Sequence, residues 1–127
     1  MTITVRARTR RSAKAAGARF ERQVADYLAE HVDDRIDRRA KNGSKDRGDL
    51  AGLRIHGLRL VAECKNTARP DLASALREAE TERANDDALA ALVISKRHGI
   101  GNPAEQLVTL RLVDLAALLT GQRPEDR

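Results

Sequence analysis

A glutamate and a lysine two residues apart, Glu63 and Lys65, are the first side chains in this sequence whose types and spacing could do chemistry. They end the segment 58–65, whose alternation predicts a β-strand, and residues two apart on a strand point to the same face. Hydrolysis of a phosphodiester needs a cation and a positioned donor, because the phosphate is anionic and repels hydroxide. One or two carboxylates are enough protein ligands for Mg²⁺. The pair therefore favours Mg²⁺-dependent phosphodiester cleavage.

A Glu-x-Lys triplet alone is also typical of a surface ion pair, since 34% of the residues are charged. Two further features favour the catalytic interpretation. Gly48-Asp49 opens the strand that comes before, and Glu21 borders the apolar stripe of a predicted first helix. The candidate catalytic residues are Glu21, Asp49, Glu63 and Lys65.

Hydrophobic periodicity divides the chain into helices and strands that must position these residues. In order they are helix 13–31, strands 34–40, 49–55 and 58–65, helix 71–83, strands 89–96 and 106–112, and helix 113–120. This is an α/β fold with an αβββαβ core, a βα extension, and helices flanking a mixed central sheet. A length of 127 residues fits one domain. We assign it to 13–121, between a flexible basic arm over 1–12 and a frayed tail over 122–127.

The turn at His56-Gly57 sets a condition on the site. A regular two-residue hairpin would pair Asp49 with Cys64 and point Asp49 away from the other candidates. A three-residue loop, or a bulge at Gly52, would instead pair Asp49 with Lys65 and restore a common face. We predict one of these irregularities, and a regular two-residue hairpin would count against the site.

Several short motifs over about 17–96 resemble those of the PD-(D/E)XK nuclease superfamily, and within it the small archaeal-type Holliday-junction resolvases, including versions carried by phages. They are Phe20-Glu21, Arg39 with Asn42-Gly43, Asp46-Arg47-Gly48-Asp49, and Val61-Ala62-Glu63-Cys64-Lys65-Asn66. Gly48 stands where the superfamily is named for a proline. The resemblance implies a restriction-endonuclease-like core.

The resemblance also implies a role for each candidate. Asp49 and Glu63 are implied to bind Mg²⁺, with Mn²⁺ as a substitute, and the backbone carbonyl of Cys64 is a further ligand. Glu21 completes the metal site directly or through water, and Lys65 orients the attacking water. Hydrolysis is implied to leave a 5′-phosphate and a 3′-hydroxyl.

The net charge is +5 and the pI about 10.0, with an excess of arginine near the N-terminus. A phosphate backbone is the predicted partner, and a solvated basic tail is the alternative. The near absence of aromatic residues, which are only Phe20 and Tyr27, argues against binding of stacked single-strand bases. The predicted DNA-binding residues are Arg8, Arg10, Arg11, Lys14, Arg38, Arg39, Lys41, Asn42, Lys45, Arg47 and Lys96.

We expect a Mg²⁺-dependent endonuclease that resolves four-way DNA junctions by symmetric cuts, and a homodimer, since a junction is nicked at two symmetry-related strands. The alternatives are a nuclease for flaps, nicked or linear DNA, and a basic DNA-binding protein without catalysis. On the second helix, Glu78, Glu80 and Glu82 are expected to form a solvated acidic face, with a place near the metal as the alternative.

Cys64 is the only cysteine, so no internal disulfide can form. A reducing cytoplasm, in a bacterium or a phage-infected cell, is the expected compartment. We expect neither a membrane span nor a small-molecule cofactor.

Overall fold

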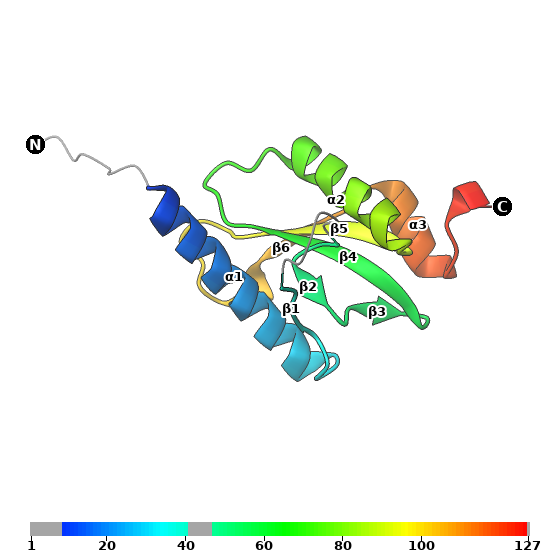
Figure 1. Cartoon of the computed structure of the whole chain (residues 1–127), viewed down its shortest axis with the longest axis horizontal. Helices are drawn as coiled ribbons and strands as arrows, with labels where there is room; N and C mark the ends of the chain where they lie inside the picture. Colours follow the sequence, from blue (N-terminus) through cyan, green and yellow to red (C-terminus); the bar gives the residue numbers. More distant parts are fainter. Residues whose placement is uncertain (1–8, 41–46, 127) are drawn as a thin grey trace, which may run out of the picture.

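The computed structural model describes residues 9–40 and 47–126. Within these ranges, three α-helices surround a four-stranded mixed sheet, and two short strands pair beside it (Figure 1). No helix in this part of the chain is long and apolar enough to cross a membrane. The elements are α1 (Arg10–His31), β1 (Asp37–Arg38), β2 (Leu50–Ala51), β3 (Arg54–Ile55), β4 (Leu58–Lys65), α2 (Leu72–Asp86), β5 (Ala90–Ser95), β6 (Leu107–Thr109) and α3 (Leu112–Thr120), with 3-10 turns at Pro103–Glu105 and Pro124–Asp126.

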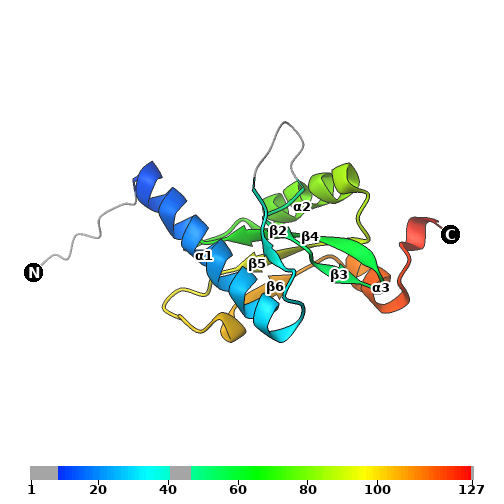
Figure 2. The ribbon, with the colours of Figure 1, turned by 60° about the horizontal axis from the view of Figure 1, so that its bottom comes forward.

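The four-stranded sheet has the order β3-β4-β5-β6. β4 and β5 are parallel and are joined by the crossover helix α2, whereas β3 and β6 run antiparallel to their neighbours. β1 pairs with β2, and Figure 2 shows this small ladder between α1 and the main sheet. The expected mixed α/β architecture is therefore confirmed.

Helix α1 covers one face of the sheet. Phe20 and Val24 on its inner side pack with Leu50 of β2, Ala62 of β4 and Ile94 of β5 in the main apolar cluster. Thr9 caps the helix by accepting a hydrogen bond from the Ser12 N–H. The helix begins at Arg10, so 10–12 belong to it and not to the flexible arm that we expected.

Helix α2 covers the opposite face with small side chains. Ala75 and Ala79 pack on Ala91 and Val93 of β5. Because alanine is small, the helix lies close to the strands. Glu63 is paired with Val93 on the neighbouring parallel strand, so its side chain lies on this same face. The sheet therefore carries a carboxyl group directly under α2.

The segment expected as one strand over 49–55 is split in two at Gly52. This residue has φ +81°, and a Cβ atom there would lie 2.5 Å from the carbonyl oxygen of Arg35. Only glycine fits a backbone that turns this way and approaches another segment so closely. β2 therefore ends at Ala51, and β3 begins at Arg54.

Beyond this break the chain forms a regular two-residue turn. Ile55 pairs with Leu58, and the two turn residues, His56 and Gly57, have φ values of +55° and +73°. Positive φ at both central residues matches the right-handed twist of the paired strands. The three-residue loop was a wrong prediction, and the regular two-residue hairpin that counts against the site is the one observed. The break at Gly52 is present.

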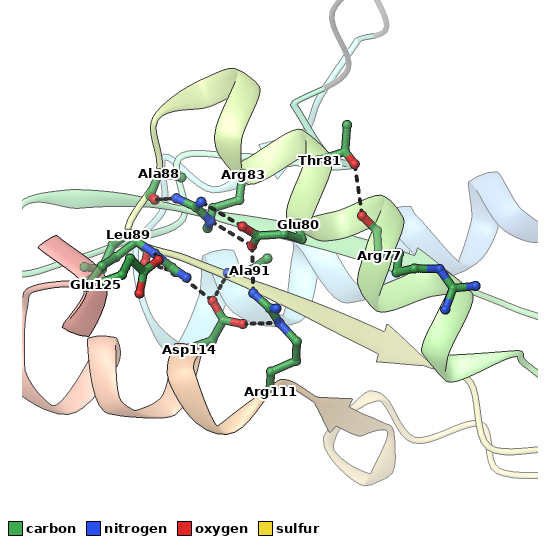
Figure 3. Close-up of polar contacts among 11 residues, drawn as sticks. Arg77, Glu80, Thr81, Arg83, Ala88, Leu89, Ala91, Arg111, Asp114 and Glu125 are labelled. Atoms are coloured by element: carbon green, nitrogen blue, oxygen red, sulfur yellow. Dashed lines mark hydrogen bonds and ion pairs between the residues drawn. The ribbon is translucent and has the colours of Figure 1, made fainter.

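Side chains from the C-terminal segment complete the sheet where β6 does not reach. β6 pairs with β5 only from Val93 onward. Upstream of that point, Asp114 of α3 accepts a hydrogen bond from the Ala91 N–H, and Arg123 donates one to the Leu89 carbonyl (Figure 3). Asp114 and Arg123 are also 2.9 Å apart as a buried ion pair. Since Arg123 is buried, the prediction of a frayed tail over 122–127 is wrong for this residue.

Two glycine substitutions test the break between β2 and β3. Gly52→Ala combines a strained φ with a clash against the backbone, and we expect it to lower the free energy of unfolding by about 2–5 kcal/mol. Gly57→Ala is the matched control, because its φ is also positive but a Cβ atom there meets nothing within 4 Å. It should cost about 1–2 kcal/mol. Urea unfolding measures both values. Equal losses of unfolding free energy in the two variants would contradict the close approach of the Arg35 backbone to Gly52.

Candidate active site

Asp49 is fixed at the start of β2 by backbone bonds on either side. Its N–H donates to the Ala62 carbonyl at 2.9 Å, and its carbonyl accepts from the Arg39 N–H at 2.8 Å. Gly48 precedes it with φ +92°, and a Cβ atom there would lie 3.0 Å from the Ala62 carbonyl oxygen. A proline, whose φ is about −65°, cannot adopt this conformation. Glycine at position 48 thus has a local structural cause.

The side chain of Asp49 turns toward the end of β4. Its Oδ2 accepts a hydrogen bond from the Cys64 N–H at 2.8 Å, and the residue is 5% exposed. The hairpin ladder, continued without a break, would have paired Asp49 with Cys64 through the backbone. The expected pairing with Lys65 is not formed. Instead, the break at Gly52 lets the backbone N–H of Asp49 bond the Ala62 carbonyl, and the Asp49 carboxylate accepts the hydrogen bond of the Cys64 N–H.

Glu63 lies between β4 and α2 and is 3% exposed. Burial raises the pKa of Glu63 to about 11, helped by a hydrogen bond with Glu82 and by the charge of Asp49. A hydrogen bond between two carboxyl groups requires that one of them holds a proton. Without a cation, Glu63 is therefore protonated at neutral pH.

Lys65 stands beside Glu63 on the same face, as alternation predicted. Its Nζ lies 3.0 Å from Glu78 Oε2 and 3.9 Å from Glu63 Oε2. Burial lowers the pKa of Lys65, but the hydrogen bond to Glu78 and the charges of Glu78 and Asp49 outweigh it, and the pKa is raised. Lys65 is therefore an ammonium group at neutral pH, able to donate hydrogen bonds and unable to act as a base.

Two carboxylates of α2 belong to this site, contrary to the expected solvated acidic face. Glu82 is 2% exposed and faces Glu63, and Glu78 holds Lys65. Glu80 lies elsewhere, paired with Arg83 and Arg111. The sequence did contain a signal for Glu82, since Ala75, Ala79, Glu82 and Asp86 all lie on the buried face of α2 at helical spacing.

Glu63, Glu78 and Glu82 could hold one metal ion. Each offers a carboxylate oxygen, and these oxygens lie within 4.8 Å of one another. Opposite ligands of Mg²⁺ are about 4.2 Å apart, and hard oxygens are the donors that this ion prefers. The donor set therefore fits Mg²⁺ or Mn²⁺.

Glu21 lies on the α1 side, apart from this carboxylate cluster. Its Oε2 accepts two hydrogen bonds from the Arg38 guanidinium, at 2.9 and 3.1 Å. Its charge acts on the Cys64 thiol, whose pKa is raised mainly by burial. The structure thus joins Asp49, Glu63 and Lys65 around the end of β4 and gives Glu21 an arginine partner instead.

The expected DNA-binding residues are distributed around the site. Lys14, Arg38 and Arg39 line an open groove of about 620 Å³ along α1, together with Glu21. Arg10 and Arg11 are exposed in the first turn of α1. Arg47 lies 3.7 Å from Asp86, and Lys96 donates to the carbonyls of its own loop. Arg8, Lys41, Asn42 and Lys45 lie outside the described residues.

Comparisons of the chain with protein-family models, with curated proteins and with solved structures found no match. The interpretation of the site therefore depends on its own geometry.

The raised pKa of Glu63 predicts how stability depends on pH. A carboxyl group whose pKa is higher in the folded state favours folding while it is protonated, so stability is lost as pH rises from about 4.5 toward about 11. In chelator, we expect the unfolding free energy of the wild type to fall, relative to that of Glu63→Gln, by up to about 1.4 kcal/mol for each unit by which the pH rises. Urea unfolding at about pH 6 and pH 9 measures this difference. Glu30→Gln, an exposed carboxylate, is the control; parallel profiles for wild type and Glu63→Gln would refute a proton on Glu63.

Proposed function

We propose that the protein is a metal-dependent DNA endonuclease of the PD-(D/E)XK type with a restriction-endonuclease-like core. One observation carries the proposal: at the end of β4, buried Glu63 lies beside the Lys65 ammonium, and the charge of Asp49 acts on both. A surface ion pair has no reason to bury its carboxylate against a second one. The order α1, four strands (β1 to β4), α2 and β5, in which β2 and β3 are the two parts of one expected strand, also supports this fold assignment.

Glu63 would hold the metal together with Asp49 and the Cys64 carbonyl, and Glu78 and Glu82 supply further carboxylates. When bound, Mg²⁺ would neutralise charge on the phosphate and lower the pKa of a coordinated water. Glu63 would lose its proton to solvent to become a ligand. Asp49, whose Oδ2 accepts a hydrogen bond from the Cys64 N–H, would join Glu63 as a ligand.

Lys65 orients the attacking water and donates to the phosphate. Its ammonium is held by the half-exposed Glu78, 3.0 Å away. Because its pKa is raised, Lys65 acts through its positive charge and its hydrogen bonds. Hydrolysis would leave a 5′-phosphate and a 3′-hydroxyl.

DNA is the substrate that the charge distribution favours. The net charge is +5, and Lys14, Arg38 and Arg39 share one groove along α1. Cations placed along a groove suit the phosphates of a duplex. We propose a four-way junction as the preferred form, cut symmetrically by a homodimer, in the cytoplasm of a bacterium or a phage-infected cell.

A cleavage assay tests the function. Labelled four-way junction, flap and linear duplex are incubated with protein and Mg²⁺ or chelator. We expect paired nicks on the junction, lost in chelator and reduced at least about 100-fold by Asp49→Asn or Lys65→Ala. Glu30→Gln should cut normally.

Binding of the junction in chelator, measured by gel shift, should persist in both inactive variants. Cutting that survives both substitutions would refute the site. Equal cutting of flaps or linear ends would support nuclease activity but contradict the four-way junction as the preferred substrate. Binding without any cutting would support a non-catalytic DNA-binding protein.

A further inference from the structure

A cavity of about 360 Å³ opens between helix α1 and the carboxyl ends of the parallel strands β4 and β5. Figure 2 shows both strands ending beside α1. In open α/β sheets, ligands bind in the crevice outside the carboxyl ends of the strands. We call this cavity the strand-end pocket, and its lining residues are Ala16, Arg19, Phe20, Gln23, Asn66 and Lys96.

Two hydrogen bonds fix the walls of the strand-end pocket. The Gln23 amide on α1 donates to the Gly101 carbonyl at 2.7 Å. The Asn66 amide, directly after β4, donates to the Ala16 carbonyl of α1 at 3.3 Å. Helix α1 is thereby tied to the segments that follow β4 and β5. The pocket is therefore formed before any ligand enters, and a ligand does not have to order its walls.

The strand-end pocket is positively charged. Arg19 and Lys96 contribute two cations, and none of the described residues that line the pocket is acidic. The groove along α1, by contrast, includes Glu21 and Asp37, whose charges oppose those of its arginines. An anion that enters the strand-end pocket therefore meets two cations and no carboxylate in its lining.

Both cations of this pocket are available to an anion. Arg19 is exposed, and its guanidinium makes no ion pair or hydrogen bond within 9–40 and 47–126. The Lys96 ammonium donates to the carbonyls of Arg97 and Ile100, and in the described part of the chain its third N–H has no acceptor. A phosphate oxygen can bond such cations without displacing a carboxylate, and hydrogen bonds between charged groups are strong.

The strand-end pocket adjoins the candidate active site. Asn66 directly follows Lys65, and the Lys96 N–H donates to the Lys65 carbonyl at 2.9 Å. The Lys65 side chain faces α2, whereas Asn66 lines the pocket on the α1 side. A DNA strand that presents one phosphate to Lys65 would therefore pass the pocket with a neighbouring phosphate.

We propose that the strand-end pocket is a second phosphate subsite, which binds a phosphodiester of the substrate strand close to the one that is cut. Arg19 and Lys96 hold this phosphate by charge and hydrogen bonds. The subsite contributes affinity and the register of the strand, as phosphate contacts do, and takes no part in bond breaking. The inference deepens the proposed function, on which the nearness of the subsite to a cut rests.

The salt dependence of DNA binding tests the role of Arg19. In chelator and at low salt, Arg19→Gln should bind a four-way junction about tenfold more weakly than wild type. The slope of log K against log salt concentration should shrink by roughly 0.9, the value for one lost phosphate contact.

Arg54→Gln is the matched control and removes the same charge. Arg54 is an exposed arginine without an ion pair among the described residues, and it pairs with Arg59 near the opposite end of β4. Its substitution should leave binding close to that of wild type. Equal weakening by the two substitutions would overturn the subsite, because it would show an effect of net charge alone. Unchanged binding by Arg19→Gln would overturn it as well.

Neutral linkages in the DNA locate the contact. Single methylphosphonates, each of which removes the charge of one phosphate, are placed in turn along the junction strands. At one position the neutral linkage should weaken wild type about as much as Arg19→Gln does, and should have little further effect in that variant. Additive losses at every position would overturn the subsite. If inorganic phosphate then competed only with proteins that keep Arg19, the pocket would hold a free anion instead.

The cleavage assay separates this subsite from the proposed function. With Mg²⁺, Arg19→Gln should raise KM about tenfold and leave kcat within about twofold of wild type, because the contact serves binding. A large loss of kcat would overturn the purely binding role. Coupling between Arg19 and one phosphate without any cutting would refute the endonuclease alone, and cutting without coupling would refute the subsite alone.

Discussion

The burial of two facing carboxyl groups, Glu63 on β4 and Glu82 on α2, is the constraint on which the rest of the site depends. Removing two like charges from water costs several kcal/mol for each ion, so the pair must keep a proton or take up a cation. The small residues Ala75 and Ala79 let α2 approach closely enough to create this contact. For stability alone, apolar side chains at positions 63 and 82 would be favoured. The arrangement is understandable if the cost is offset when a metal ion binds.

The backbone around Asp49 serves the same site from the opposite side. Gly52 interrupts the ladder, and Gly48 itself lies against Ala62 of β4, so that the Asp49 carboxylate reaches the Cys64 N–H. Both glycines have positive φ, which would strain any other residue. The polypeptide thus departs from a regular hairpin only in the segment that carries Asp49. This localisation favours a functional reason for the irregularity.

Alternation and helical periodicity predicted much of the fold. β4 has the expected bounds of 58–65, and Glu63 and Lys65 share a face as period-two alternation requires. The break at Gly52 could be predicted only as one of two alternatives, because it depends on how closely Arg35 passes. The C-terminal cap by Asp114 and Arg123 was missed, since a polar tail gives no local sign that a distant strand edge needs its hydrogen bonds.

Charged residues were harder to place than apolar ones. Glu82 was assigned to solvent because arginines flank it, although its position continued the Ala75–Ala79 stripe. Glu21 was assigned to the metal site, whereas Arg38, distant in sequence, pairs with it. In both cases the outcome depends on which charge the tertiary fold brings near, and helical spacing alone does not contain that information.

Exchange of the Glu63 proton for a divalent cation is the step on which the proposed site depends. Calorimetric titration of Mn²⁺ into metal-free protein at about pH 8, in two buffers of different ionisation enthalpy, counts the protons released on binding. We expect about one proton per bound ion for wild type and for Glu30→Gln, and loss of both binding and proton release in Glu63→Gln. Binding without proton release, or unchanged binding in Glu63→Gln, would contradict this exchange.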